Sequence, residues 1–467
     1  MRMSDIINLL KEYLVLGIIA LIFFGILFFI GYKVIYKRKT KGTKTINKRQ
    51  LILYGISICY IIVMLGAVFL NRSGVYGTAN LHLFSSYIQA YNEMDISLFR
   101  NIILNILLFI PLGFLLPIYT DKLKKIYKVV PIGFAVTLAI EIIQYITQMG
   151  IFEIDDVFNN TLGVLIGYSI FMIYDSLKNK MDRKKILIYA LPTIITICAF
   201  LGIYIKYQNQ ELGNLYFKYN YKINMKNAKV ESNIELSEQR EKLDIFYTKI
   251  LTEEETKKIA TSIFEKIGTH ISEDDTDLYE NTAMYYSSGR NNNVSVKYNG
   301  GTYSYTDYSK FTDDGIMPQK TGATRNEIEL ALQQFDIKIP ENAEFKEESN
   351  GDYSFTINMH LEENGLTDGN LRCSYYQDGT IKSIHNNLVK YQKVKNKEII
   401  SSKEAYNEIL EGKFKYGEYY LDKIENVVIE NVNTKYTLDS KGFYVPVYVF
   451  ESKINNIDYD IYIEAIK

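Results

Sequence analysis

The sequence predicts an α-helical membrane bundle of about six transmembrane helices, followed by an extracytoplasmic α+β domain with two lobes. Two observations support this fold class. Long apolar runs dominate residues from about 14 to 205, whereas the remainder is rich in Asn, Lys, Glu and Tyr and has only short apolar stretches. The net charge of −1 over 467 residues is an average over both parts of the chain, so it does not reveal the apolar character of the first part.

The apolar runs are long enough to span a bilayer, which takes about 20 residues. We expect spans at residues 14–36, 51–70, 98–119, 129–149, 157–174 and 186–205. The first run is too long for a signal peptide, lacks a small-residue cleavage site and ends in a basic cluster. It is therefore interpreted as a retained helix.

The basic residues between the spans predict the orientation of the chain. Clusters of Lys and Arg follow the first, third and fifth spans, whereas the other loops carry mainly acids. Positive residues mark the cytoplasmic side. We therefore expect a multi-pass protein of the cell membrane, with its N-terminus and its C-terminal domain extracytoplasmic.

Polar residues inside the spans gather at one depth. Glu141 lies eight residues before Met149, or about 12 Å below the outer boundary at 1.5 Å per residue. Gln144 lies on the same helix face as Glu141. Asn101 and Asn105 of another span lie about 5–10 Å below the same boundary. The amides alone fit ordinary helix pairing, worth about 0.6 kcal/mol each. Glu141 favours function, because a buried carboxylate costs about 3 kcal/mol.

The segment "IFEIDDVFNNTLGVLIG" adds two acids and two amides at the start of the fifth span. Asp155 and Asp156 are expected at the outer membrane surface, with Asn159 and Asn160 directly beneath them. Gly163 and Gly167 have the GxxxG spacing that favours close helix packing over ligand contact.

These residues resemble the VanZ-like family of teicoplanin-resistance membrane proteins over about residues 55–175. The motifs that match in order are Arg72 with "NLHLF" (80–84), "NIILNILLFIPLGFLLP" (101–117), "EIIQ" (141–144) and "DDVFNNTLGVLIG" (155–167). Two positions depart from the family pattern: Leu83 replaces a usual proline, and Ile151 or Phe152 lies near a frequently basic position. The candidate polar site is Arg72, Asn80, Asn101, Asn105, Glu141, Gln144, Asp155, Asp156, Asn159 and Asn160, with Gly113, Gly163 and Gly167 in helix packing.

The resemblance implies a helical bundle with an outer-surface polar motif and reduced sensitivity to teicoplanin, but it supplies no reaction. Paired carboxylates can act as general acid and base when their environments separate their pKa values, so catalysis stays open and no catalytic residue is assigned. No metal site and no cofactor are predicted. The expected partners are membrane lipids, with a lipid-linked cell-wall precursor or a glycopeptide as further candidates; no basic patch indicates nucleic acid.

The C-terminal half has its own pattern of helices and strands. Capping boxes begin at Thr252, Thr324 and Ser401, and alternating strands follow each helix, with Pro446 suggesting an edge strand or a bulge. This half weakly resembles PepSY-like ectodomains and those of YycH/YycI-type regulators, which implies a binding or regulatory module. We expect an N-terminal helix and loop (1–50), a VanZ-like domain (51–175), a cytoplasmic loop with the last helix (176–207), and two lobes (208–345 and 346–467, the second PepSY-like).

Three functional classes follow from these features. The leading hypothesis is glycopeptide resistance or the handling of lipid-linked envelope precursors at an outer-leaflet polar site. The second is an envelope sensor whose outer domain binds an envelope protein, and the third is a lipid transporter. Substitution of Glu141 and Asp156 would separate the first from the second.

Overall fold

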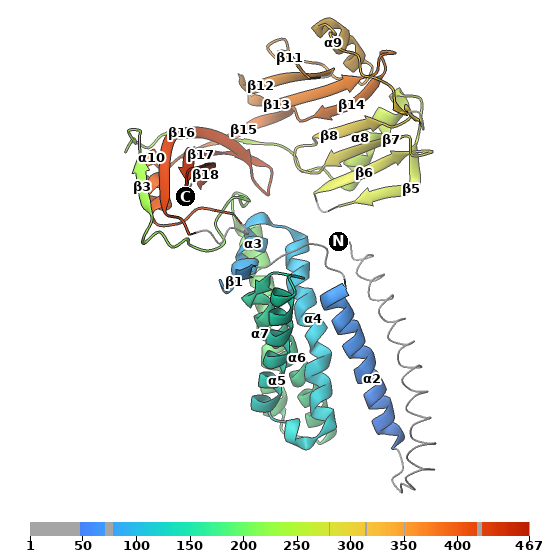
Figure 1. The fold of residues 1–467 in the computed structure, drawn as a ribbon, viewed down its shortest axis with the longest axis vertical. Coiled ribbons are helices and arrows are strands. Elements are labelled where there is room, and N and C mark those ends of the chain that lie inside the picture. Colours follow the sequence, from blue (N-terminus) through green and yellow to red (C-terminus); the bar gives the residue numbers. More distant parts are fainter. Residues whose placement is uncertain are drawn as a thin grey trace. The chain divides into compact units, whose positions relative to one another are not determined.

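The computed structural model describes residues 47–70, 78–279, 281–312, 315–349, 351–417 and 423–466. It divides into two compact units (Figure 1). The helical unit contains the described residues up to Ala90 and Asp95–Asn209. The sheet-rich unit contains Tyr91–Met94 and nearly all described residues from Gln210 onward. A helical membrane region followed by an α+β domain is therefore confirmed.

Five helices of the described chain are long and apolar enough to cross a membrane, as expected of a multi-pass membrane protein. They correspond to five of the six predicted spans, and the predicted span 14–36 lies outside the described residues. A short additional helix, α3, precedes the second of them. The helices are α2 (Lys48–Leu65) with the π-helical turn η2 (Gly66–Leu70), α3 (Ser85–Glu93), α4 (Ile96–Tyr119), η3 (Asp121–Leu123), α5 (Ile126–Ile146), α6 (Ile154–Lys178) and α7 (Arg183–Asn209).

Helices α4 and α6 approach each other backbone to backbone at three glycines. A Cβ atom built on Gly113 would lie 1.9 Å from the Val164 carbonyl oxygen. One on Gly163 would lie 2.1 Å from the Ile106 carbonyl oxygen. One on Gly167 would lie 1.9 Å from the Ile110 carbonyl oxygen. Only hydrogen side chains fit at these positions, so the structure places the three predicted packing glycines in one helix contact.

Two very short strands connect the loop before α3 to the start of α6. Strand β1 (Ala79–Asn80) pairs in parallel with β2 (Phe152–Glu153), so that Asn80 lies opposite Glu153. The Phe152 N–H donates to the Thr78 carbonyl oxygen at 3.0 Å. This pairing brings two of the predicted motifs together at the same end of the bundle.

The sheet-rich unit contains a branched 14-stranded sheet in its described residues, with the main order β3-β16-β17-β4-β15-β13-β14-β8-β7-β6-β5. Strand β12 pairs with β13 and with β11, and β18 pairs with β17, whereas β9 and β10 form a separate two-stranded sheet. The bounds are β3 (Lys229–Ser232), β4 (Lys242–Tyr247), β5 (Ile271–Leu278), β6 (Thr282–Ser287), β7 (Asn292–Lys297), β8 (Tyr303–Asp307), β9 (Phe311–Thr312), β10 (Gly315–Ile316), β11 (Glu344–Ser349), β12 (Asp352–Glu362), β13 (Gly365–Tyr375), β14 (Ile381–Asn386), β15 (Val389–Glu398), β16 (Asn426–Leu438), β17 (Phe443–Ile454) and β18 (Ile457–Glu464).

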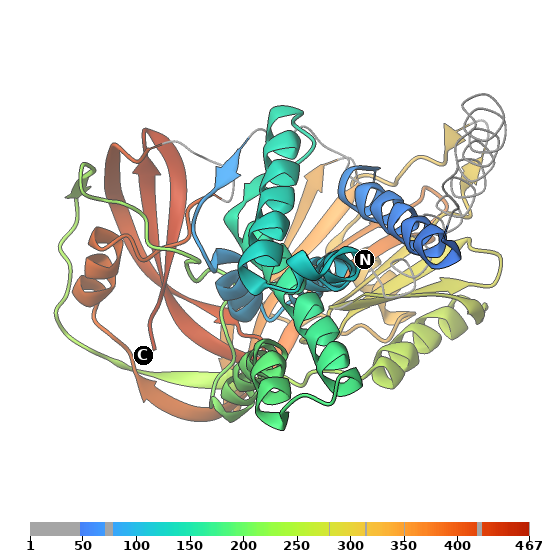
Figure 2. The same cartoon turned by 90° about the horizontal axis from the view of Figure 1, so that it is seen from below.

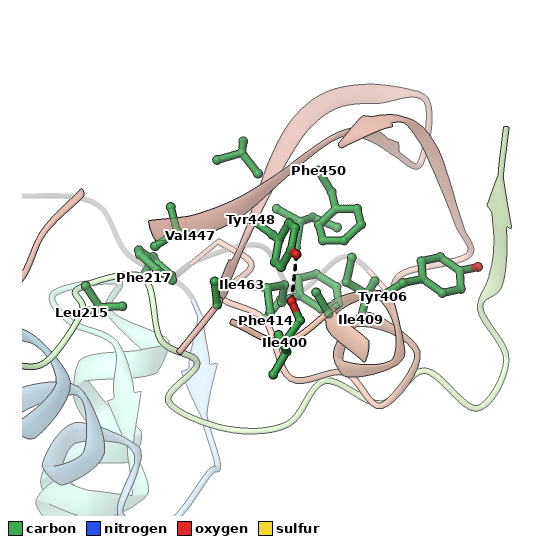
Figure 3. Packing of buried hydrophobic residues seen from close by; sticks show 14 of the residues in the cluster. Leu215, Phe217, Ile400, Tyr406, Ile409, Phe414, Val447, Tyr448, Phe450 and Ile463 are labelled. Carbon is green, nitrogen blue, oxygen red and sulfur yellow. Dashed lines mark hydrogen bonds between the residues drawn. The ribbon is translucent and has the colours of Figure 1, made fainter. Parts of the chain in front are cut away.

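This unit has two main hydrophobic cores. One is built from buried residues between Ala260 and Ile384. The other combines Leu215, Phe217 and Ile245 with buried residues from Ile399 onward. Figure 3 shows the second core, where the Tyr448 hydroxyl donates to the Ile400 carbonyl oxygen at 2.8 Å. Figure 2 shows both groups of strands from below. The predicted division at 345/346 does not coincide with these cores, because β12–β14 pack with the strands and helices that precede them.

The three predicted capping boxes are confirmed. They begin α8 (Glu253–Lys266), α9 (Arg325–Gln333) and α10 (Ser402–Leu410), and each has both reciprocal hydrogen bonds. The prediction of an edge strand or a bulge at Pro446 is wrong, because β17 is an interior strand and Pro446 pairs in register with Tyr436 of β16. Pro446 instead faces the gap where β17 changes partner, after Tyr444 pairs with β4 and before Val447 pairs with β18. A residue without an N–H is tolerated at such a gap.

Ser401→Ala is expected to destabilise the sheet-rich unit by about 1 kcal/mol, the usual loss for a helix cap. Ser401 is buried, and its hydroxyl accepts from the Glu404 N–H at 3.1 Å. Thermal unfolding of the purified protein should show a lower midpoint for this transition. The control is Asn407→Ala, an exposed position of the same helix, which should not lower the midpoint because alanine favours the helix. Equal midpoints for all three proteins would contradict a stabilising cap.

Candidate polar site in the helical bundle

The polar residues of the helical unit gather around the N-terminal turns of α6. We define the polar cluster as Asn105, Glu141, Gln144, Asp155, Asp156, Asn159 and Asn160. Glu141 comes from α5 and is only 2% exposed. Its carboxylate accepts from the backbone N–H of Glu153, the N-cap residue of α6, at 3.2 Å. Glu141 thus joins the end of α5 to the start of α6, where the first N–H groups of a helix need acceptors.

The adjacent aspartates of α6 have different partners. Asp155 is 1% exposed and accepts from the backbone N–H groups of Phe84 and Ser86, at 2.5 and 2.8 Å. It therefore caps the start of α3 from another helix. Asp156 accepts instead from the Asn105 side-chain amide of α4 at 2.6 Å. Consecutive residues of a helix point about 100° apart, which explains how one Asp-Asp pair reaches two neighbours.

Each buried amide of the cluster uses one of its polar atoms to join helices. Asn160 donates to the Thr137 hydroxyl of α5 at 2.8 Å. Gln144 donates to the Val68 carbonyl oxygen, in the last turn of the first described helix, at 3.1 Å. Asn159 accepts a hydrogen bond from the Tyr87 hydroxyl of α3. These contacts hold neighbouring helices together, which is the structural role that the sequence analysis considered as an alternative to a functional site.

The other polar atom of each amide is buried and has no hydrogen-bond partner among the described residues. These atoms are Gln144 Oε1, Asn159 Nδ2 and Asn160 Oδ1. The three side chains are 0%, 1% and 5% exposed. An unsatisfied buried polar group costs about 1–3 kcal/mol. Helix pairing therefore accounts for one polar atom of each amide and does not explain why the other polar atom is buried.

The remaining predicted site residues lie differently. Asn80 donates to the Ser85 hydroxyl at 2.9 Å and accepts from the His82 N–H, so it orders the turn before α3. Asn101 is exposed on α4. Arg72 lies outside the described residues. Leu83, the departure from the family proline, is also exposed, and Phe84 next to it has a φ of 68°.

Four residues near the cluster were missed from the sequence: Tyr87, Thr137, Ser86 and Glu153. Tyr87 and Ser86 belong to α3. The two serines before "YIQAYNE" are a helix-start signal from which this helix could have been predicted. Burial, followed by the charges of Asp155 and Asp156, raises the pKa of the Tyr87 phenol above its usual value. Tyr87 is therefore a hydrogen-bond donor at neutral pH.

The cluster combines amide donors, amide acceptors and carboxylates in a low-dielectric environment. Within the described parts of the chain, no group of three His, Cys, Asp or Glu side chains could hold a metal ion. Such an arrangement suits recognition of a neutral or zwitterionic polar group that both donates and accepts hydrogen bonds. The fold and this cluster define a multi-pass membrane protein with a buried polar site near one end of its bundle.

One family model matches most of the helical part of the chain. Residues 51–175 match the family model VanZ/LLP1, which confirms the VanZ-like resemblance for this segment. No curated protein matches the chain. Among solved structures, the C-terminal domain of Bacillus megaterium YpeB is similar at 15% identity and a TM-score of 0.20, covering 47% of this chain and 95% of that one. A TM-score this low carries no argument, so the PepSY-like character of the C-terminal half stays a prediction.

Proposed function

We propose that the polar cluster binds the polar headgroup of an envelope lipid or lipid-linked cell-wall precursor in the outer leaflet. Through this site the protein lowers the sensitivity of the cell to glycopeptides of the teicoplanin type. The observation that supports the proposal is a set of buried amide atoms without a hydrogen-bond partner in the described residues: Gln144 Oε1, Asn159 Nδ2 and Asn160 Oδ1. A ligand with hydroxyl or amide groups would satisfy all three, since it can both donate and accept.

The amides support this proposal better than the carboxylates do. Glu141 and Asp155 each accept from backbone N–H groups, which gives both a structural purpose. The unsatisfied amide atoms have no such purpose in the described residues, although each costs about 1–3 kcal/mol. Unsatisfied buried polar groups are rare in native structures and need an explanation, which a bound ligand would supply here.

The outer-leaflet location rests on the distribution of basic residues. The cluster lies near the start of α6, whereas Lys122, Lys124 and Lys125 lie between α4 and α5, at the opposite end of these helices. Because basic loops stay in the cytoplasm, the cluster end is assigned to the outside.

Single-cysteine labelling is expected to show this orientation. In a version without Cys59, Cys198 and Cys373, cysteines at Asp95 and Gly300 should react with an impermeant maleimide in whole cells. A cysteine at Lys41 should react only after lysis. Labelling of Lys41→Cys from outside intact cells would reverse the orientation and move the site to the inner leaflet.

Asn159→Leu is the sharpest test of the site, because it keeps the branching of the side chain and removes both the unsatisfied Nδ2 donor and the Oδ1 acceptor of the Tyr87 hydroxyl. In a Gram-positive host that depends on this protein for protection, we expect normal membrane levels and at least a fourfold loss of teicoplanin resistance. Ser169→Ala is the control: Ser169 is buried in the same helix, and its hydroxyl donates to the Leu165 carbonyl oxygen of that helix. It should keep full resistance.

Two outcomes would reject the proposal. Asn159→Leu with full resistance at normal levels would mean that neither the free Nδ2 atom nor the hydrogen bond from Tyr87 takes part in the function. The second outcome is full resistance in Glu141→Gln combined with Asn159→Leu, and loss of resistance only when residues 210–467 are deleted. That result would favour the sensor hypothesis.

A further inference from the structure

A hydrophobic groove of about 540 Å³ lies between α6 and α7. Its α6 wall contains Phe158, Leu162 and Leu165, spaced four and three residues apart on one helix face. Its α7 wall includes Pro192, Thr196 and Ala199. These three side chains are short and lie on one face of the helix, so they form the hollow. The groove is a candidate site for a long apolar group.

One end of the groove has an aromatic rim. Phe84 packs edge-on against Phe158 and Tyr87, with ring centroids 5.3 and 5.8 Å apart. Tyr87 lies 6.3 Å from the ring of Phe200 across the groove. Tyrosine is enriched at the level of lipid headgroups, where its ring meets apolar chains and its hydroxyl meets polar groups. Tyr87 therefore marks the end of the groove at which a bound lipid would place its polar part.

Tyr87 connects the groove to the polar cluster. Its ring lines the groove, and its hydroxyl donates to Asn159 Oδ1. The other polar atom of that amide, Asn159 Nδ2, is buried and has no partner in the described residues. An apolar surface and an unsatisfied polar group thus meet at one tyrosine.

The length of the groove indicates which kind of lipid chain fits it. From Ile203 to Ile188 it follows α7 for about 22 Å at 1.5 Å per residue, longer than the ~15 Å of one leaflet in a 30 Å hydrocarbon core. An extended acyl chain of this length fits along the groove in single file, whereas a polyprenyl chain is much longer than the groove.

We propose that the ligand of this protein is an acyl lipid, with one chain in the α6–α7 groove and its headgroup at the polar cluster. This inference rests on the proposed headgroup site and narrows its ligand to a lipid with linear chains. Tyr87 lies at the junction and positions the headgroup against Asn159. The second acyl chain stays in the surrounding bilayer.

The test uses the full-length protein in phosphatidylglycerol vesicles that contain a trace of phosphatidylglycerol with a diazirine on one acyl chain. After irradiation, mass spectrometry maps the labelled residues. We expect the groove residues Leu165, Leu191 and Ile195 to be labelled several times more than Ile194, Ile197 and Leu201, which are exposed on α7 outside the groove.

Two matched variants sharpen the test. Ala199→Phe fills the groove and should lower groove labelling about fivefold, without changing labelling of the outward residues. Cys198→Phe adds the same ring at the neighbouring exposed position and should change neither. The unchanged outward labelling also reports that each variant is folded in the membrane.

Three results would overturn the inference. The first is equal labelling of the groove and outward residues. The second is loss of groove labelling when polyprenyl phosphate is added. The third is groove labelling that appears only after residues 14–36 of the same chain are deleted. Failure here is distinguishable from failure of the proposed function. Uniform labelling with a normal Asn159→Leu effect rejects only the acyl groove, whereas intact groove labelling with no Asn159→Leu effect rejects only the headgroup site.

Discussion

Gly167→Leu should largely eliminate the folded protein from the membrane. A Cβ atom at this position would meet three backbone atoms of α4, namely the Ile110 carbonyl oxygen at 1.9 Å, its carbon at 2.9 Å and the Phe114 nitrogen at 2.9 Å. Backbone atoms cannot rotate away as a flexible side chain does, so the helices must separate. Overpacking typically costs about 1–3 kcal/mol, and the separation also loses contacts along the helix pair.

The matched control is Gly202→Leu in α7, where a new Cβ would meet nothing within 4 Å. This variant should accumulate as the parent does. Membrane levels by immunoblot, and the midpoint of thermal aggregation in detergent, measure the difference. A Gly167→Leu protein with the level and midpoint of the parent would show that α4 and α6 do not touch at this glycine.

Asp155→Ala should release α3 from the bundle and remove resistance while the membrane helices stay folded. The carboxylate of Asp155 is the acceptor for the N–H groups of both Phe84 and Ser86. Hydrogen bonds to charged groups are worth about 1.5–3 kcal/mol each. A nine-residue helix is not stable on its own, so α3 depends on such contacts to stay folded against the bundle. Hydrogen exchange of residues 84–90 should rise by at least tenfold.

Asp156→Asn provides the comparison, since Asp156 bonds to Asn105 of α4. Its exchange in α3 should match the parent, because an asparagine oxygen can still accept from Asn105. If Asp155→Ala leaves exchange of α3 unchanged, another contact holds this helix. If both variants raise it equally, the two aspartates do not have separate partners.

The transmembrane helices and the capped helices of the sheet-rich unit were predictable, because local signals determine them. Long apolar runs predict spans without reference to their neighbours, and a capping box such as Ser401 with Glu404 is complete within four residues. Pro446 was mispredicted for the opposite reason. Its environment depends on where β4 ends and β18 begins, and these strands are about 200 residues apart in the chain.

The polar cluster was predictable only as a set of residues. Depth along each span places both Glu141 and Asn159 in the outer leaflet, but the partners of each atom depend on helix rotation and on β1–β2, which no local pattern indicated. The sequence therefore favoured the carboxylate of Glu141 as the functional group. The structure instead leaves the unsatisfied atoms on the amides.

The glycine contacts between α4 and α6 have a mechanical consequence for the bundle. That pair is locked by backbone contact, whereas α7 has no buried residue among those described. Helices α4 and α6 thus form a stiff pair, and α7 lies against α6 through side chains that are at most partly buried. Loss of contacts to α7 would therefore expose no fully buried α7 side chain, whereas separation of α4 from α6 would break a backbone contact.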